Sequence, residues 1–120
     1  MKYPNLRNDL KEYLGVLSDT RYQQKHWIEN LVHQEKEGDT FDMFIHFWFD
    51  DMALSEEPEK CIGIFLKNAE ESNVIKEITF YLESMFNEFG LEASVVTYLQ
   101  SSQWKEVIRL AYIAKSIIFD

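Results

Sequence analysis

Apolar residues recur every three or four positions along most of the chain, which is the spacing of one face of an α-helix. The first stripe predicts a helix entered at Pro4-Asn5 and left at Ser18-Asp19, and its members are Leu6, Leu10, Tyr13, Leu14 and Leu17. Asp19 is also a suitable cap for a second helix, which carries Tyr22, Trp27 and Ile28. The N-terminal quarter is therefore predicted to be helical.

The middle of the chain alternates between breaks and apolar runs. Residues 33–40 are polar and contain Gly38, so they predict a loop. Residues 41–52 are dense in apolar side chains at helical spacing, and Ser55 to Lys60, with Pro58, ends that helix. Residues 61–66 leave two interpretations open, helical or extended, because a short apolar run with β-branched members fits both. An extended segment would lack an obvious partner strand.

The C-terminal half contains the clearest helices. Asn68 and Glu71 have the spacing of a capping box, and Gly90 is typical of the residue just after a helix. The stripe between them consists of Val74, Ile75, Ile78, Leu82, Met85, Phe86 and Phe89. A short helical turn over residues 93–99 leads to Ser101-Ser102, which cap a last helix with Trp104, Val107, Ile108, Ala111, Ala114, Ile117 and Ile118 on one face. We therefore predict an all-α fold, a compact single-domain bundle of about five or six helices over residues 1–120.

Composition restricts the class of protein. The chain has 120 residues, 46% of them hydrophobic and 18 aromatic, which suits one domain with a real core. A sequence pI near 4.8 argues against binding nucleic acid or an anionic membrane. No apolar run approaches the roughly 20 residues of a membrane span, and the N-terminus does not resemble a signal peptide. With a single cysteine, these features predict a soluble cytoplasmic protein without a membrane partner.

The net charge of −9 is concentrated in one segment. Residues 29–71 carry twelve acids and three bases, whereas the acids and bases of the remaining residues balance. An imbalance confined to one segment suggests a surface that meets a basic partner. We therefore expect charge reversal at Asp50 and Asp51 to weaken partner binding more than reversal at Glu83 and Glu88, which lie outside the segment.

Aromatic rings are interleaved with these acids between residues 41 and 51. On a regular helix, Phe47 and Phe49 point away from the side that carries Phe44, Ile45 and Trp48. We expect this helix to be buried all round, as helices this apolar usually are. The alternative is that Trp48 or Phe49 faces a partner, since aromatic anchors surrounded by charge are typical of interface hot spots.

Candidate chemistry is sparse. Asp42, His46 and Asp50 stand at i, i+4 and i+8, so a helix would place them on one face, where they could bind a divalent metal. A polar stripe on an otherwise apolar helix explains the same pattern, and we expect neither a metal nor another cofactor. Cys61 has apolar neighbours and is expected to be a packing residue. The chain has no phosphate-binding loop and no hydrolase motif, so we expect no enzymatic activity.

Several segments give the chain a family resemblance. They are the N-terminal Met-Lys-Tyr-Pro-Asn-Leu-Arg-Asn-Asp-Leu, Tyr22-Gln-x-x-x-Trp27, Ile45-His-Phe-Trp-Phe-Asp-Asp51, Ile62-Gly63 and Trp104-x-x-Val107. Together they resemble a family of small bacterial proteins of largely uncharacterised function. Some proteins of this type look like immunity proteins of bacterial toxin systems, including contact-dependent growth inhibition. The resemblance implies a helical, cytosolic protein with no catalytic residues and no cofactor.

The leading hypothesis joins the charge pattern to this resemblance. Many antibacterial toxin domains are basic nucleases, and an acidic protein could cover the active site or the substrate groove of such a toxin. The expected contacts are Asp39, Asp42, Asp50, Asp51, Glu56, Glu57 and Glu59, with Trp48 or Phe49 as an anchor. The alternatives are a small metal-binding helical protein and an adaptor or oligomeric helical domain without a toxin partner.

Overall fold

The computed structural model describes residues 4–29, 41–51 and 57–118. Within these ranges the chain is helical and forms no sheet, which confirms the all-α prediction. The α-helices are α1 (Pro4–Leu17), α2 (Thr20–Gln23), α4 (Phe41–His46), α5 (Ala69–Phe89), α6 (Val95–Leu99) and α7 (Ser102–Ile117). Two π-helical segments, η1 (Gln24–Glu29) and η2 (Phe47–Asp51), continue α2 and α4, and a 3₁₀-helix, η3 (Pro58–Cys61), precedes α5.

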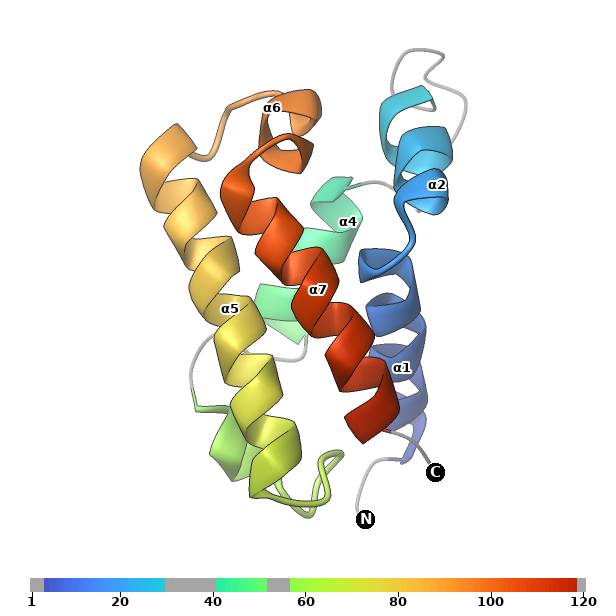
Figure 1. The fold of residues 1–120 in the computed structure, drawn as a ribbon. Coiled ribbons are helices and arrows are strands. Elements are labelled where there is room, and N and C mark those ends of the chain that lie inside the picture. Colours follow the sequence, from blue (N-terminus) through green and yellow to red (C-terminus); the bar gives the residue numbers. More distant parts are fainter. Residues whose placement is uncertain (1–3, 30–40, 52–56, 119–120) are drawn as a thin grey trace.

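Three long helices form the frame of the bundle. α7 packs against both α5 and α1, and Figure 1 shows it running between them in the opposite direction to α5. Their facing sides bury the stripes predicted from the sequence, including Leu10, Leu14, Ile78 and Leu82, each fully inaccessible to solvent. Amphipathic stripes that face a common interior are what hold such a bundle together.

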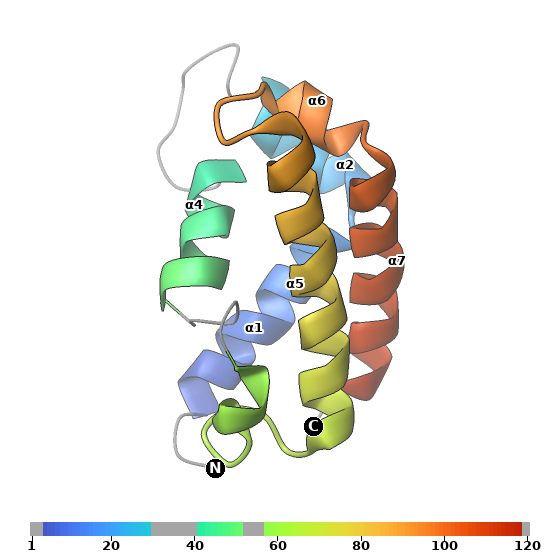
Figure 2. The ribbon, with the colours of Figure 1, turned by 90° about the vertical axis from the view of Figure 1, so that its left-hand side faces the viewer.

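The helix made of α4 and η2 closes one side of the core. In Figure 2 it stands apart from α7, and α5 lies between the two. Its Phe41 contacts Trp27, Phe86, Tyr98 and Trp104, so one ring meets residues from four other elements. This helix is therefore positioned by aromatic packing on residues far apart in the sequence.

Side-chain caps fix the starts of several helices, as the sequence predicted. Asp19 accepts a hydrogen bond from the Tyr22 amide at 3.0 Å, and Ser101 accepts one from the Trp104 amide at 3.0 Å. Gly90 ends α5 with φ of 82° and ψ of 176°, a conformation essentially restricted to glycine. The starts of α2 and α7 and the end of α5 thus follow from residues recognisable in the sequence.

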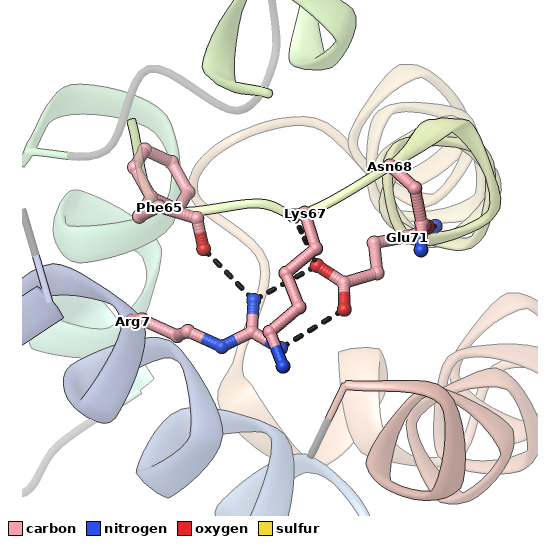
Figure 3. A network of polar contacts seen from close by, with 5 residues as sticks. All are labelled: Arg7, Phe65, Lys67, Asn68 and Glu71. Atoms are coloured by element: carbon pink, nitrogen blue, oxygen red, sulfur yellow. Dashed lines mark hydrogen bonds and ion pairs between the residues drawn. The ribbon is translucent and has the colours of Figure 1, made fainter. Parts of the chain in front are cut away.

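One buried ion pair ties α1 to the start of α5, and the sequence pattern did not predict it. Figure 3 shows the Arg7 guanidinium donating to both carboxylate oxygens of Glu71, at 2.8 and 2.9 Å, and to the Phe65 carbonyl at 3.0 Å. The Glu71 carboxylate also accepts a hydrogen bond from the Lys67 amide at 2.7 Å, while Asn68 caps the Glu71 amide. The predicted capping box is therefore half formed, because Glu71 turns to Arg7 and Lys67 instead of the Asn68 amide.

Three expectations for the middle of the chain are corrected or resolved. Cys61 ends η3, and residues 62–66 form a turn closed by hydrogen bonds from the Phe65 and Leu66 amides to the Cys61 carbonyl, so the segment is neither an α-helix nor a strand. Cys61 is half-buried, and burial, with a smaller contribution from the Glu59 carboxylate, raises the pKa of its thiol. The α4–η2 helix is not buried all round, since half of Met43 is exposed.

Phe47 is buried, as expected for a helix covered on several sides, but it shares a side with Phe44, since Tyr13 of α1 contacts both rings. Its side chain is only 8% exposed and stacks on Tyr13 of α1, with ring centroids 3.8 Å apart. If only one neighbouring helix covered the α4–η2 helix, Phe47 would face solvent. In the structure α1 covers the side that carries Phe47, and α5 contacts the side that carries Phe49. A helix packed between two others can bury a wider arc than a single stripe.

Candidate partner-binding groove

An open apolar groove of about 760 Å³ lies between the α4–η2 helix and α5. Four lining residues come from α4 and η2, five from α5, and the last follows the end of α5. They are Ile45, His46, Phe49 and Asp50 from the first wall, Phe80, Glu83, Ser84, Phe86 and Asn87 from the second, and Leu91. Figure 2 shows α4 and α5, the helices that provide the two walls, beside each other.

The α4–η2 wall combines an apolar row with a polar row. Ile45 and Phe49 are half-buried and one helical turn apart, and Phe49 contacts Phe86 across the groove with ring centroids 6.3 Å apart. Beside them, His46 Nδ1 and Asp50 Oδ2 are 2.7 Å apart. Both polar side chains remain mostly accessible, 70% for His46 and 65% for Asp50, so this wall presents its carboxylate to solvent.

The α5 wall uses a second stripe of that helix, separate from the one in the core. Phe80, Ser84 and Asn87 recur at i, i+4 and i+7, which places them on one face. Two large apolar side chains lie near the ends of this wall and are unusually accessible: Phe80 is 62% exposed and Leu91 is 82% exposed. Apolar side chains of this size gathered at one groove, rather than scattered, indicate a binding surface.

Apart from the imidazole of His46, the ionisable side chains that line the groove are acidic. Asp50 stands on one wall and Glu83 on the other, and both are exposed. No lysine or arginine occurs among the described residues that line it. Low-dielectric walls that carry charge of one sign focus the electrostatic potential, so a cationic segment is the favoured occupant.

The structure separates the predicted contact residues into several groups. Asp42, Phe49 and Asp50 belong to the α4–η2 helix, and Phe49 and Asp50 line the groove. Asp51 ends η2, but its side chain lies outside the described part, as do Asp39 and Glu56. Trp48 is fully buried and donates a hydrogen bond to Thr79 at 2.9 Å, so it is a core residue here and Phe49 is the candidate anchor.

The remaining two predicted contacts, Glu57 and Glu59, are exposed, and each is paired with a lysine. Glu57 forms an ion pair with Lys60, and Glu59 lies 3.3 Å from Lys76 of α5. A hydrogen bond from its own backbone, followed by those lysines, lowers the pKa of Glu59. Because their charge is partly compensated, these two acids contribute less to the acidic surface than a count of carboxylates suggests.

The metal-binding alternative gains no support from the described residues. His46 and Asp50 meet, but no group of three side chains of the metal-binding types is gathered in the described ranges. A divalent site needs a matched set of ligands, which one histidine–aspartate pair does not provide.

The residues of the second wall were not predicted from the sequence. Phe80, Glu83 and Leu91 lie outside the acidic segment, and Glu83 was expected to be a remote control for Asp50. Glu88, the other control residue, accepts a hydrogen bond from Gln103 of α7 at 2.7 Å and does not line the groove. Phe80 could have indicated this wall in advance. It is a large apolar residue outside the apolar stripe that this helix buries in the core.

Comparison with known proteins adds a family. The family model described as "Domain of unknown function (DUF7945)" matches residues 1–119. The chain belongs to this family. No curated protein and no solved structure matches it. None of the described helices is both long and apolar enough to cross a membrane.

Proposed function

We propose that this protein is a cytoplasmic immunity protein that binds and neutralises a cognate bacterial toxin, a nuclease, and that it is not an enzyme. It does so by covering the active site or substrate groove of the toxin with its acidic side. The observation that carries this proposal is the apolar groove with exposed carboxylates on both walls. The resemblance to immunity proteins of toxin systems supports the choice of partner.

Electrostatics supports a nuclease as the partner. A nuclease active site is basic because it binds phosphate, and the exposed Asp42, Asp50 and Glu83 carry the same sign as the nucleic acid that it accepts. Complementary charge accelerates association and disfavours partners of the wrong sign. An inhibitor must capture its toxin before the toxin reaches its target, so a fast association rate suits this function.

Apolar contacts supply what charge alone does not. Exposed ion pairs contribute little to affinity, whereas a few apolar or aromatic side chains at the centre of an interface often dominate it. Phe49 and Phe80 occupy this position, with Asp50 and Glu83 beside them. An apolar centre with a charged rim is the usual anatomy of a stable protein–protein interface.

The test uses the product of the gene next to the one for this protein. We expect the purified toxin domain to cleave nucleic acid, and an equimolar amount of this protein to bind it and abolish cleavage. Chelation of divalent ions, tested on binding alone, should leave the complex intact. A neighbouring toxin that is neither bound nor inhibited would contradict the proposal. A neighbouring gene without a toxin would favour the adaptor alternative.

A further inference from the structure

The shape and chemistry of the groove restrict what part of a partner can occupy it. Both walls are helices, whose backbone N–H and C=O groups bond within each helix. The described helical residues of the two walls therefore offer no row of free backbone groups on which a partner strand could pair. An extended segment pressed against Ile45, Phe49 and Phe86 would leave its own backbone groups without hydrogen bonds, at a cost for each group.

A helix avoids this cost because its backbone bonds are internal. The apolar stretch also has helical dimensions: from Phe80 to the end of α5 at Phe89 it runs about 14 Å, the rise of about two and a half turns. Leu91 extends the apolar surface beyond that end and is the most exposed large apolar side chain described, at 82%. A partner helix could therefore place apolar residues at i, i+3 or i+4, and i+7 along the groove.

The carboxylates define the flanks of that helix. Asp50 rises from the η2 wall and Glu83 from the α5 wall, so the apolar floor has one acid on either side. A helix that lies between them meets negative charge along both edges of its buried stripe. Lysine or arginine beside the stripe would satisfy both acids, whereas aspartate or glutamate there would be repelled.

We propose that the groove between α4–η2 and α5 receives a cationic amphipathic α-helix of the partner protein. The inference deepens the proposed function, since it names the part of the toxin that docks and the groove that receives it. Phe49 and Phe80 contact the apolar stripe of that helix, and Asp50 and Glu83 pair with its flanking cations. The helix enters as a preformed element, because the groove cannot bond an extended backbone.

The experiment selects ligands for the groove directly and does not require the toxin to be identified. A phage-displayed library of random peptides of about 16 residues, long enough for four helical turns, is selected on the full-length protein. Peptides that also bind the Phe80→Ala variant are removed. The matched control is Tyr112→Ala, which truncates an aromatic side chain of similar exposure, 69%, on α7 outside the groove. Both variants replace exposed residues, and circular dichroism checks that each is folded.

We expect the enriched peptides to carry apolar residues at i, i+3 or i+4, and i+7 with lysine or arginine beside them. Their affinity, measured by fluorescence anisotropy, should fall about tenfold or more in Phe80→Ala and in Asp50→Lys, the size of a hot-spot loss. It should be unchanged in Tyr112→Ala. A proline in the middle of the peptide should abolish binding, because it breaks the helix.

Other outcomes overturn the inference. These are no enrichment over Phe80→Ala, enriched peptides that are acidic or rich in proline, and equal losses in Phe80→Ala and Tyr112→Ala. Self-association that Phe80→Ala abolishes would assign the groove to a second copy of the chain instead. The experiments distinguish the two proposals. If the toxin binds Phe80→Ala as well as the wild type, the proposed function remains and the groove assignment is wrong. If cationic helical peptides are selected but no toxin binds, the groove assignment remains and the proposed function is wrong.

Discussion

Arg7 and Glu71 form the pair of side chains whose disruption we expect to cost the most stability. Both are almost completely buried, with 1% and 2% of their side chains exposed. Arg7→Met leaves a buried carboxylate without its cation, and such changes typically cost about 3–5 kcal/mol of unfolding free energy. Urea denaturation followed by tryptophan fluorescence measures this loss.

The control for Arg7 is a surface pair of the same length. Arg109 and Glu106 are also 2.8 Å apart, but 54% and 38% of their side chains are exposed. Arg109→Met should cost no more than about 1 kcal/mol, because solvent screens the pair. Similar losses in the two variants would mean that the Arg7 pair is not shielded from water as described.

Glu71 should also make stability depend on pH. Burial by itself would raise the pKa of its carboxyl, but hydrogen bonds from Arg7 and the Lys67 amide outweigh burial and hold the pKa below its ordinary value of 4.5. Because the folded pKa is the lower one, the contribution is present above about pH 4.5 and is lost as the pH falls toward the folded pKa. Unfolding free energies measured between pH 7 and pH 3 should fall less steeply in Glu71→Gln than in the wild type. An unchanged slope would contradict this account.

At the scale of single elements, two glycines should respond to alanine in opposite directions. Gly15 lies inside α1, and a Cβ there would meet nothing within 4 Å, so Gly15→Ala should stabilise the protein by about 0.5–1 kcal/mol. Gly90 has equal space but a φ of 82°, so Gly90→Ala should destabilise it by about 1–3 kcal/mol through backbone strain. Thermal melts of the two variants provide the comparison, and two shifts of the same sign would contradict the assigned helix end.

The elements themselves were predictable where the local pattern sufficed. α1, α5 and α7 each have an apolar stripe and a recognisable start or end, so they were placed almost to the residue. The π-helical segments η1 and η2 were not predicted, because their residues suit an α-helix equally well. Their aromatic contacts come from other elements: Phe47 meets Tyr13, and Trp27 meets Trp104. The turn at 61–66 was ambiguous because its apolar residues, such as Phe65 and Leu66, are buried by tertiary packing alone.

At the scale of the whole molecule, half of the candidate site was predictable. The acidic, aromatic wall with Phe49 and Asp50 was apparent because its residues are close together in the sequence. The other wall, with Phe80 and Glu83, comes from a helix that begins eighteen residues after η2 ends and looks electrostatically ordinary. Only the packing of α5 beside α4 makes these residues one surface, so Glu83, which the charge along the chain made a control for Asp50, lies on the opposite wall of the same groove.

Treating Asp50 and Glu83 as acids of one groove gives a prediction for the complete surface. Asp50→Lys with Glu83→Lys reverses the charge on both walls of the groove, whereas Asp9→Lys with Glu12→Lys makes the same change in net charge at exposed sites on α1, whose residues do not line the groove. Association with the toxin domain should slow by about tenfold or more in the first variant and much less in the second.

Added salt should slow association of the wild type strongly and that of the groove variant little, since screening acts over about 8 Å at physiological ionic strength. Stopped-flow association rates at several salt concentrations measure both effects, after circular dichroism has shown that the two proteins are folded. Equal slowing in the two variants would mean that net charge steers the toxin and that the position of the acids at the groove does not.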